Sequence, residues 1–266
     1  MLYLSILSAF AWEAKTDNSG APLLWPNNEI VYYLNTDGYT DLTEADIEQA
    51  IIASASAWDA NQFNAGLTFS YQGMTKTKGA DFSDGEHSIS FDDSWSEDPE
   101  LLAITYVWSN SNGEIIHFDI EINIDDVEWS VSGENGKHDL TNSMTHEFGH
   151  ALGLEHSDDL EATMAPTTSM GETKKRDIND DDAQGFSTLY PVGYGAGNST
   201  EDGNSDGSDN SNSNDGGGSY GGGPNTTPQN TGGGGGPVQL ETGCTYTPAA
   251  VLWLTGIGLL GMRRQR

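Results

Sequence analysis

The amino-acid sequence predicts an α+β fold, in which a twisted mixed sheet of about five strands is combined with three helices. Three observations predict it: short runs of β-branched and aromatic residues, apolar residues at helical spacing behind capping residues, and one stretch of strict polar–apolar alternation. All of them fall between Trp25 and Tyr190. A segment of roughly this size is enough for one domain with a substantial core.

The strands are predicted from composition and from alternation. Residues 30–34 read IVYYL, and comparable short runs follow at 67–71, 88–91 and 104–108. Residues 115–123 alternate without a break, so their side chains point to opposite faces of the sheet. The apolar side comprises Ile116, Phe118, Ile120 and Ile122, and the polar side comprises His117, Asp119, Glu121 and Asn123. We therefore expect a half-buried strand with a polar outer face.

Capping signals place the first two helices. Thr43 and Asp46 form a capping box, and the apolar residues behind it recur at helical spacing over about four turns. These apolar residues are Ile47, Ile51, Ala55 and Trp58. A second helix is expected over 140–152, with Asp139 as a favourable charge at its start and Gly153 as its terminator.

The third helix closes the predicted domain. It is expected over 180–189, with Asn179 as its cap and Pro191 beyond its end. The tract 193–237 holds sixteen of the 33 glycines and no Val, Ile, Leu, Phe or Trp, so it cannot offset its ordering entropy. The predicted segments are a leader over 1–11, a globular domain over 12–192, a disordered tether over 193–241 and an anchor over 242–266.

The chain is strongly acidic, with 41 acidic and 10 basic side chains and a formal net charge of −31. Phosphate binding needs clustered Lys and Arg, and none lies between Arg176 and Arg263, which excludes nucleic acid as the main partner. Two interpretations of the acidity are compatible with each other: a solvated, self-repelling surface and a set of calcium-binding carboxylates. We expect a monomer.

The first eleven residues resemble an export signal. They read MLYLSILSAFA, an apolar run that ends in Ala9-Phe10-Ala11 like a small-residue cleavage site. The basic residues that usually precede such a run are missing, and a buried N-terminal strand is the alternative. We expect an exported protein, extracellular or at a bacterial cell surface.

The C-terminal segment combines the tripeptide Thr242-Gly243-Cys244, an apolar run over 249–262, and a final cluster of three arginines. The run is shorter than the roughly 20 residues of a membrane span, and the basic cluster is typical of a cytoplasmic end. This arrangement resembles bacterial sorting signals of the MYXO-CTERM kind, and an ordinary membrane anchor is the alternative. We therefore expect Cys244, the single cysteine, outside the globular domain, which then has no disulfide and no cysteine metal site.

The predicted chemistry lies in the sequence HEFGHALGLEHS, which begins at His146. His146 and His150 are four residues apart on the second helix, so their imidazoles share one face and reach one zinc ion. Glu147 lies beside the metal, where its carboxylate is placed to accept a proton from zinc-bound water. Gly153 ends the helix and lets the chain return His156 as the third ligand. Three neutral histidines leave one coordination position open, as in catalytic zinc sites.

This pattern resembles the extended signature of the metzincin zinc peptidases, HExxHxxGxxH followed by a methionine turn. The sequence Thr163-Met164-Ala165-Pro166 matches that turn, which implies that Met164 packs beneath the metal. Ser157, after the third histidine, points to the matrixin-like branch. The third helix agrees with that branch, and the resemblance implies that its paired aspartates, Asp181 and Asp182, brace the turn.

The chain departs from animal matrixins in two respects. No cysteine precedes Cys244, so latency through a prodomain cysteine is not expected. The sequence His117-Phe118-Asp119 is similar to the segment that holds a structural zinc and calcium in those proteins, but His87 is the only upstream histidine to complete such a site. A second zinc is therefore the less favoured alternative to outward-facing strand residues.

The sequence thus predicts a secreted or surface-tethered zinc endopeptidase of extracellular proteins, with Glu147 as general base. The resemblance implies that the strand over 115–123 pairs with an extended substrate by β-addition. Two alternatives stay open: a non-catalytic adhesion or binding module on the same scaffold, and a protease restricted to one partner or to self-processing. The complete set of zinc ligands, His146, His150 and His156, together with Met164, favours an enzyme.

Overall fold

The structure is a computed structural model of the chain, and it describes residues 10–195 and 238–246. The strands of its main sheet are β1 (Glu29–Asn35), β2 (Thr68–Met74), β3 (Ser88–Asp92), β4 (Ala103–Ser109), β5 (Ile115–Asn123) and β9 (Val238–Thr242). The helices are α1 (Glu44–Ala57), α2 (Ala60–Phe63), α3 (Leu140–Ala151), the 3-10 turn η1 (Lys174–Arg176) and α4 (Asp180–Leu189). Two short strand pairs join β6 (Trp129–Ser130) to β7 (His138–Asp139) and β8 (Thr167–Thr168) to β10 (Thr245–Tyr246).

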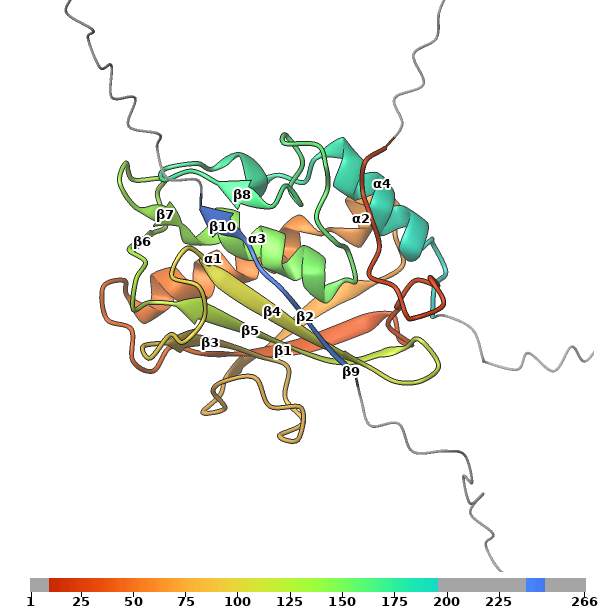
Figure 1. Ribbon diagram of the computed structural model, residues 1–266, viewed down its shortest axis with the longest axis horizontal. Coiled ribbons are helices and arrows are strands. Elements are labelled where there is room, and N and C mark those ends of the chain that lie inside the picture. The colour runs from red at the N-terminus through yellow and green to blue at the C-terminus, as the bar shows by residue number, and fades with distance from the viewer. Residues whose placement is uncertain (1–9, 196–237, 247–266) are drawn as a thin grey trace, which may run out of the picture.

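The predicted fold class is confirmed. The main sheet has the strand order β2-β1-β3-β5-β4-β9, and the helices lie against one of its faces (Figure 1). Strand β1 runs parallel to β2 and β3, and β3 runs parallel to β5, whereas β4 is antiparallel to β5. All five predicted strands and all three predicted helices are present. Strand β9 is a sixth strand that was not predicted.

The core forms between the sheet and helices α1 and α3. Thr43 caps α1 as predicted, since its hydroxyl accepts a hydrogen bond from the backbone N of Asp46 (3.1 Å). On α3, the ring of Phe148 packs against the rings of Tyr32, Phe69 and Phe118, which come from three different strands. This aromatic contact fixes the height of α3 above the sheet, and α3 carries the candidate site.

The prediction that the polar side of β5 faces outward is wrong. His117 and Asp119 are buried because the loop between β2 and β3 folds over this side of the sheet. Asn123 is buried as well, and its side-chain amide donates to the carbonyl oxygen of Leu101. The backbone N of Asp81 in that loop donates to Asp119 Oδ2 (3.1 Å), and the ring of Phe82 lies against that of His117. A polar face of a strand is thus buried here because a loop supplies its hydrogen-bond partners.

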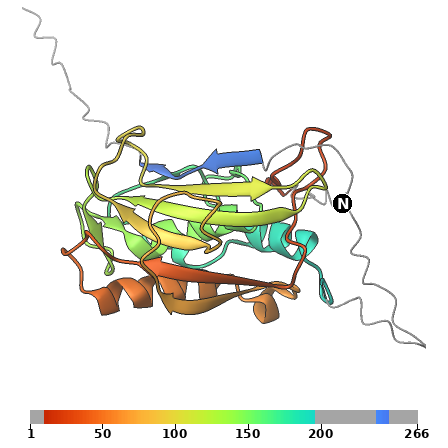
Figure 2. The same ribbon diagram turned by 90° about the horizontal axis from the view of Figure 1, so that it is seen from below.

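The expectation that β5 pairs with substrate is also wrong. Strand β5 lies between β3 and β4, so both of its backbone edges are already used within the sheet. Strand β4 lies beyond it, and its outer edge pairs with β9 in antiparallel register (Figure 2). The backbone edge next to the candidate site is therefore that of β4.

The C-terminal part of the chain departs from its predicted place. Residues 196–237 of the predicted tether lie outside the described part, but residues 238–241 belong to β9. Cys244, expected outside the domain, is fully buried and belongs to the main hydrophobic core, since it lies between β4 and β8. Residues 1–9 of the leader predicted over 1–11 and the apolar run over 249–262 lie outside the described residues. Among residues 10–195 and 238–246, no helix has the length and apolar character needed to cross a bilayer.

Candidate metal centre

The start of helix α3 is anchored by one carboxylate. Asp139 accepts a hydrogen bond from the backbone N of Asn142 (2.9 Å), as an N-cap does, and both of its oxygens also accept from the Arg176 guanidinium. The carboxylate is buried, and the paired guanidinium offsets the cost of removing its charge from water. The helix that carries the site therefore begins at a fixed point.

The end of α3 requires a glycine. Gly153 has a φ of +89°, in the left-handed region that other residues rarely adopt. A Cβ at this position would also lie 2.9 Å from the carbonyl oxygen of Leu23. The backbone N of Gly153 donates to the carbonyl oxygen of His150 (2.9 Å), and the chain then reverses toward the helix. This reversal brings His156 back to the face that carries the first two histidines.

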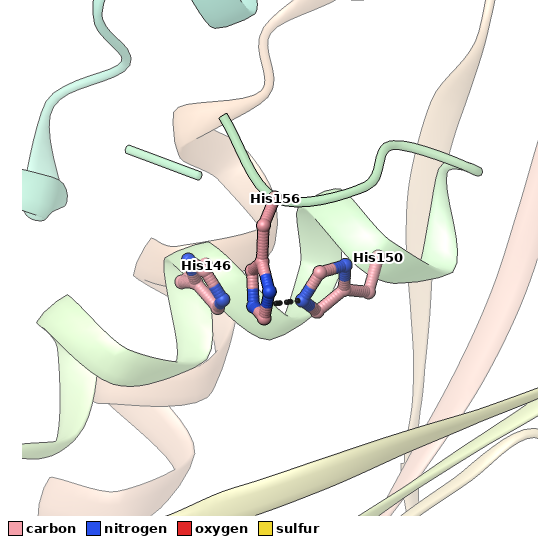
Figure 3. A group of neighbouring side chains, drawn as sticks. All are labelled: His146, His150 and His156. Atoms are coloured by element: carbon pink, nitrogen blue, oxygen red, sulfur yellow. Dashed lines mark hydrogen bonds between the residues drawn. The ribbon is translucent and has the colours of Figure 1, made fainter. Parts of the chain in front are cut away.

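The three predicted ligands converge on one point (Figure 3). One ring nitrogen from each of His146, His150 and His156 lies within 4.8 Å of the other two. The Nε2 atoms of His150 and His156 are 3.3 Å apart. No other group of three or more His, Cys, Asp or Glu side chains converges in this way among the residues described.

The second nitrogen of two of these rings is fixed by backbone carbonyls. His146 Nδ1 donates to the carbonyl oxygen of Thr163 (2.8 Å), and His150 Nδ1 donates to that of Leu154 (2.8 Å). A proton on Nδ1 leaves the Nε2 lone pair for a metal, and such outer hydrogen bonds orient metal-bound histidines. His146 Nε2 is buried and has no hydrogen-bond partner within residues 10–195 and 238–246.

Burial keeps the three imidazoles neutral. It lowers the pKa of His156 and lowers those of His146 and His150 well below the usual value. The Lys175 ammonium acts in the same direction on all three rings, and the Lys15 ammonium does so on His150 and His156. Neutral imidazoles are the form that binds metal ions. An orphaned buried nitrogen within a set of three converging imidazoles fits a zinc ion with one coordination position left open.

Glu147 lies on the same helix with its carboxylate held at both oxygens. Oε2 accepts from the hydroxyl of Thr105 on β4 (2.6 Å), and Oε1 accepts from the backbone N of Cys244 (3.0 Å). The side chain is fully buried, and this burial raises the pKa of Glu147 to about 8 despite the two hydrogen bonds. Both carboxylate oxygens are thus held in place, and Oε1 faces the backbone of Cys244.

Met164 lies directly beneath the ligand-bearing helix, as expected. It is fully buried, and a Cβ added at Gly149 would overlap its sulfur and also meet the Trp58 ring at 2.8 Å. Gly149 lies between the two helical ligands in the chain. The methionine turn therefore packs in contact with the helix backbone at the level of the site.

The two adjacent aspartates, Asp181 and Asp182, accept hydrogen bonds from different segments of the chain. Asp182 accepts hydrogen bonds from the backbone N of Thr163 (2.5 Å) and of Met164 (3.3 Å), so it braces the methionine turn as expected. Asp181 differs from the expectation, because it accepts from the hydroxyl of Ser157 (2.9 Å), next to the third histidine. Burial raises the pKa of Asp182 to about 6.

Replacing Asp182 with alanine is expected to lower the free energy of unfolding by roughly 2–4 kcal/mol, because two buried backbone N–H groups lose their acceptor. The Thr163 carbonyl that orients His146 lies in the same turn, so zinc affinity is expected to fall as well. Urea unfolding of the zinc-free chain measures the first effect.

Asp180→Ala is the matched control, since Asp180 is exposed in the first turn of the same helix. The Asp180 carboxylate interacts with the helix dipole as Asp182 does. Its replacement is expected to lower the free energy of unfolding by less than about 1 kcal/mol. Equal losses in the two variants would show that Asp182 acts through helix charge and does not brace the turn.

The segment considered for a second zinc is built as a hydrogen-bonded network. His117 Nε2 lies 3.0 Å from Asp119 Oδ2, and Asp119 Oδ1 accepts from the backbone N of Ser88 (2.8 Å). His87 Nδ1 donates to the carbonyl oxygen of Val31 (2.7 Å). The outward-facing orientation expected as the alternative is wrong too, because His117 and Asp119 are buried under the β2–β3 loop, to which His87 belongs.

Three residues near the site were missed from the sequence: Thr105, Lys175 and Cys244. Thr105 binds the Glu147 carboxylate from a neighbouring strand, and the buried Lys175 ammonium lies 3.7 Å from the sulfur of Cys244. They reach the site through contacts between residues about 40 to 100 positions apart. Spacing within one helix carries no information about such contacts.

Comparison with known proteins agrees with this geometry. A family model described as Matrixin matches residues 24–191, which is more than half of the chain. The chain is 31% identical over 171 residues to Matrix metalloproteinase-18 of Xenopus laevis. It is 30% identical over 174 residues to Metalloendoproteinase 2-MMP of Arabidopsis thaliana, and 31% identical over 169 residues to Interstitial collagenase of Bos taurus.

Each of these three matches covers 62% of the chain. The matched regions are 33%, 42% and 32% of the lengths of the three relatives, in the same order. The chain therefore spans about a third to two fifths of the length of these curated relatives.

Proposed function

Because the chain belongs to the matrixin family, we propose that it is a zinc-dependent endopeptidase in which His146, His150 and His156 hold the metal and Glu147 is the general base. The observation that carries this proposal is the convergence of three buried imidazole nitrogens beside a buried, hydrogen-bonded carboxylate. A purely structural zinc site would have four protein ligands, and only three converge among the described residues.

A zinc ion held by these rings supplies Lewis acidity, which polarises the scissile carbonyl and lowers the pKa of water. The residues of the chain position the other reacting groups. The Thr163 and Leu154 carbonyls hold the imidazoles in one tautomer, and the Thr105 hydroxyl fixes Oε2 of Glu147. The Glu147 carboxylate takes a proton from the attacking water and passes it to the leaving amine nitrogen.

Proteins or peptides in extended conformation are the proposed substrates. The outer edge of β4 offers backbone hydrogen bonds on one side of the site, and β8 offers them on the other. In this structure the cleft between β4 and β8 is filled by residues 238–246 of the chain itself. The cleft therefore accepts a peptide backbone along its length.

Export is part of the proposal. It is supported by the resemblance of residues 1–11 to a signal peptide and by the apolar run and arginine cluster after residue 246. We propose that these segments direct the protein to the outside of the cell or to a bacterial cell surface. Calcium binding by the acidic surface stays an expectation.

Removing the metal tests the proposed activity. The full chain is assayed on casein alone, with 1,10-phenanthroline, and after zinc is added back. A Gly243→Val chain is assayed beside it, because a Cβ at Gly243 would overlap the Ala103 carbonyl oxygen and displace the segment that fills the cleft. We expect cleavage that the chelator abolishes and zinc restores.

Two outcomes contradict the proposed activity. Cleavage that persists in excess chelator would show that the metal is not required. A Gly243→Val chain that binds one zinc and cleaves no casein would show that the site is not a general endopeptidase.

A further inference from the structure

The segment of residues 238–246, named here the tail segment, lies along the whole candidate site. Its first part, β9, pairs antiparallel with β4 from Thr105 to Ser109, and its last part, β10, pairs parallel with Thr167 and Thr168 (Figures 1 and 2). The segment is thus a single extended chain between two backbone walls. One wall is the sheet edge and the other follows the methionine turn.

The peptide bond between Gly243 and Cys244 lies at the catalytic residues. The backbone N of Cys244 donates to Oε1 of Glu147 (3.0 Å), and the backbone of Gly243 lies beside the His156 ring. The nitrogen of this bond therefore meets the proposed general base, while its other half meets a proposed metal ligand. A substrate amide about to be cut needs the general base next to its nitrogen, since the base must deliver a proton there.

The walls hold this bond in register from both sides. The backbone N of Leu102, just before β4, donates to the carbonyl oxygen of Cys244 (2.9 Å). The backbone N of Thr245 donates to the carbonyl oxygen of Pro166, just before β8 (3.0 Å). The Cys244–Thr245 peptide group, directly after the bond, is thus held at its carbonyl oxygen by one wall and at its nitrogen by the other. This is the pattern of a bound extended peptide.

Side chains of the domain also fit this part of the tail segment. The ammonium of the fully buried Lys15 donates to the hydroxyl of Thr242 (2.6 Å), and that of Lys175 lies 3.7 Å from the sulfur of Cys244. Cys244 is itself fully buried. Gly243 approaches β4 so closely that a Cβ would overlap the Ala103 carbonyl oxygen. Thr242, Gly243 and Cys244 therefore each make a close contact with the domain.

The cysteine sulfur is not a fourth metal ligand. Among the residues described, the group of converging ligand atoms comprises one nitrogen each from His146, His150 and His156, and Cys244 Sγ is not part of it. Its neighbours are the Lys175 ammonium and, at 3.7 Å, the carbonyl oxygen of Thr245. The tail segment therefore brings a peptide bond, and not its thiol, to the candidate site.

We propose that the tail segment is a substrate of the chain's own site, and that the bond cut is Gly243–Cys244. This inference rests on the proposed function. The oxygen of one water forms a bond to the Gly243 carbonyl carbon as the C–N bond to Cys244 breaks. Glu147 carries one proton of that water to the Cys244 nitrogen. The second proton of the water passes from the new carboxylic acid to the amine, so the products are a carboxylate at Gly243 and an ammonium group at Cys244. The catalytic domain then separates from the apolar run over 249–262.

The test uses the full chain, loaded with zinc, with its products measured by mass spectrometry. We expect two fragments, one ending at Gly243 and one beginning at Cys244, and a rate that does not depend on protein concentration. Gly243→Val is expected to abolish this cut while casein cleavage persists. The control Val238→Ala, at the exposed end of β9, is expected to leave the cut unchanged.

A second readout does not need catalysis. Cys244 is the only cysteine of the chain, so its alkylation reports directly whether the tail segment is seated. In the zinc-free wild-type chain we expect labelling at least about tenfold slower than in urea, because the thiol is exposed only on local opening. In zinc-free Gly243→Val we expect fast labelling.

The outcomes separate the two proposals. Casein cleavage by the Gly243→Val chain together with an intact Gly243–Cys244 bond in the wild type would overturn self-cleavage and leave the endopeptidase standing. Labelling of the folded zinc-free wild type as fast as in urea would overturn the seating of the tail segment. If neither casein nor the tail is cut by a zinc-loaded chain, the proposed function fails, and self-cleavage fails with it.

Discussion

Replacing Glu147 with alanine is expected to lower the rate of casein cleavage by about 10²–10⁴-fold, the usual contribution of a positioned general base. The bound zinc is expected to remain, because none of the three converging imidazoles is changed. The same substitution is expected to leave the Gly243–Cys244 bond intact. Zinc content per chain and initial rates on casein, measured on the same preparation, check the prediction.

The matched control for this substitution is Glu161→Ala. Glu161 is an exposed glutamate beyond the third histidine, and its carboxylate contacts only the Lys174 ammonium at 3.6 Å among the residues described. It is expected to keep both zinc and activity. A Glu147→Ala chain that retains activity at full zinc occupancy would refute the role of Glu147 as base. A chain that loses zinc as well would show that the carboxylate supports the metal site.

The part of the site that is local in sequence could be predicted. His146, His150 and His156 converge because one helical turn and one glycine-ended reversal fix their relative positions over eleven residues. The capping residue Thr43 and the methionine beneath the helix are equally short-range features. The matrixin resemblance drawn from these residues is confirmed at the level of the family.

The order of the strands could not be predicted, because it depends on pairings between distant segments. Alternation over 115–123 correctly predicts a strand, but it does not show that β5 lies inside the sheet and that β4 borders the cleft. Nor does alternation reveal that a loop supplies partners for Asp119 and buries the polar face. Both predictions are wrong because the alternation within one strand carries no information about the strands and loops beside it.

The place of Cys244 could not be predicted for a different reason. The glycine-rich tract before it cannot form a core, and its composition favours placing the residues that follow it outside the domain as well. Residues 238–246 read VQLETGCTY, in which Val238 and Leu240 alternate with polar residues as in a strand. This signal was present, but the strand needs the edge of β4 to pair with, and the sequence does not show that this edge is available.

Replacing His150 with alanine is expected to remove zinc from the chain and, with it, all casein cleavage. Zinc bound by several protein ligands gains about 10–16 kcal/mol, so one ligand is worth roughly 3–4 kcal/mol, or about 10²–10³-fold in affinity. His150 is fully buried and its Nε2 lies 3.3 Å from that of His156, so its loss leaves two of the three converging ligands. Equilibrium dialysis against buffered zinc measures the loss, and circular dichroism of the zinc-free chain shows whether the fold is kept.

His87→Gln is the matched control, and it also tests the alternative of a second zinc. His87 is half-buried beside the His117 ring, with centroids 5.0 Å apart, and it lies outside the group of converging ligands. We expect the wild type and His87→Gln to bind one zinc each and to cleave casein at the same rate. Two zinc ions in the wild type and one in His87→Gln would place a second metal on the β2–β3 loop. An His150→Ala chain that still binds one zinc tightly and cleaves casein would refute the three-histidine site, because two imidazoles cannot hold the metal against the buffer at that affinity.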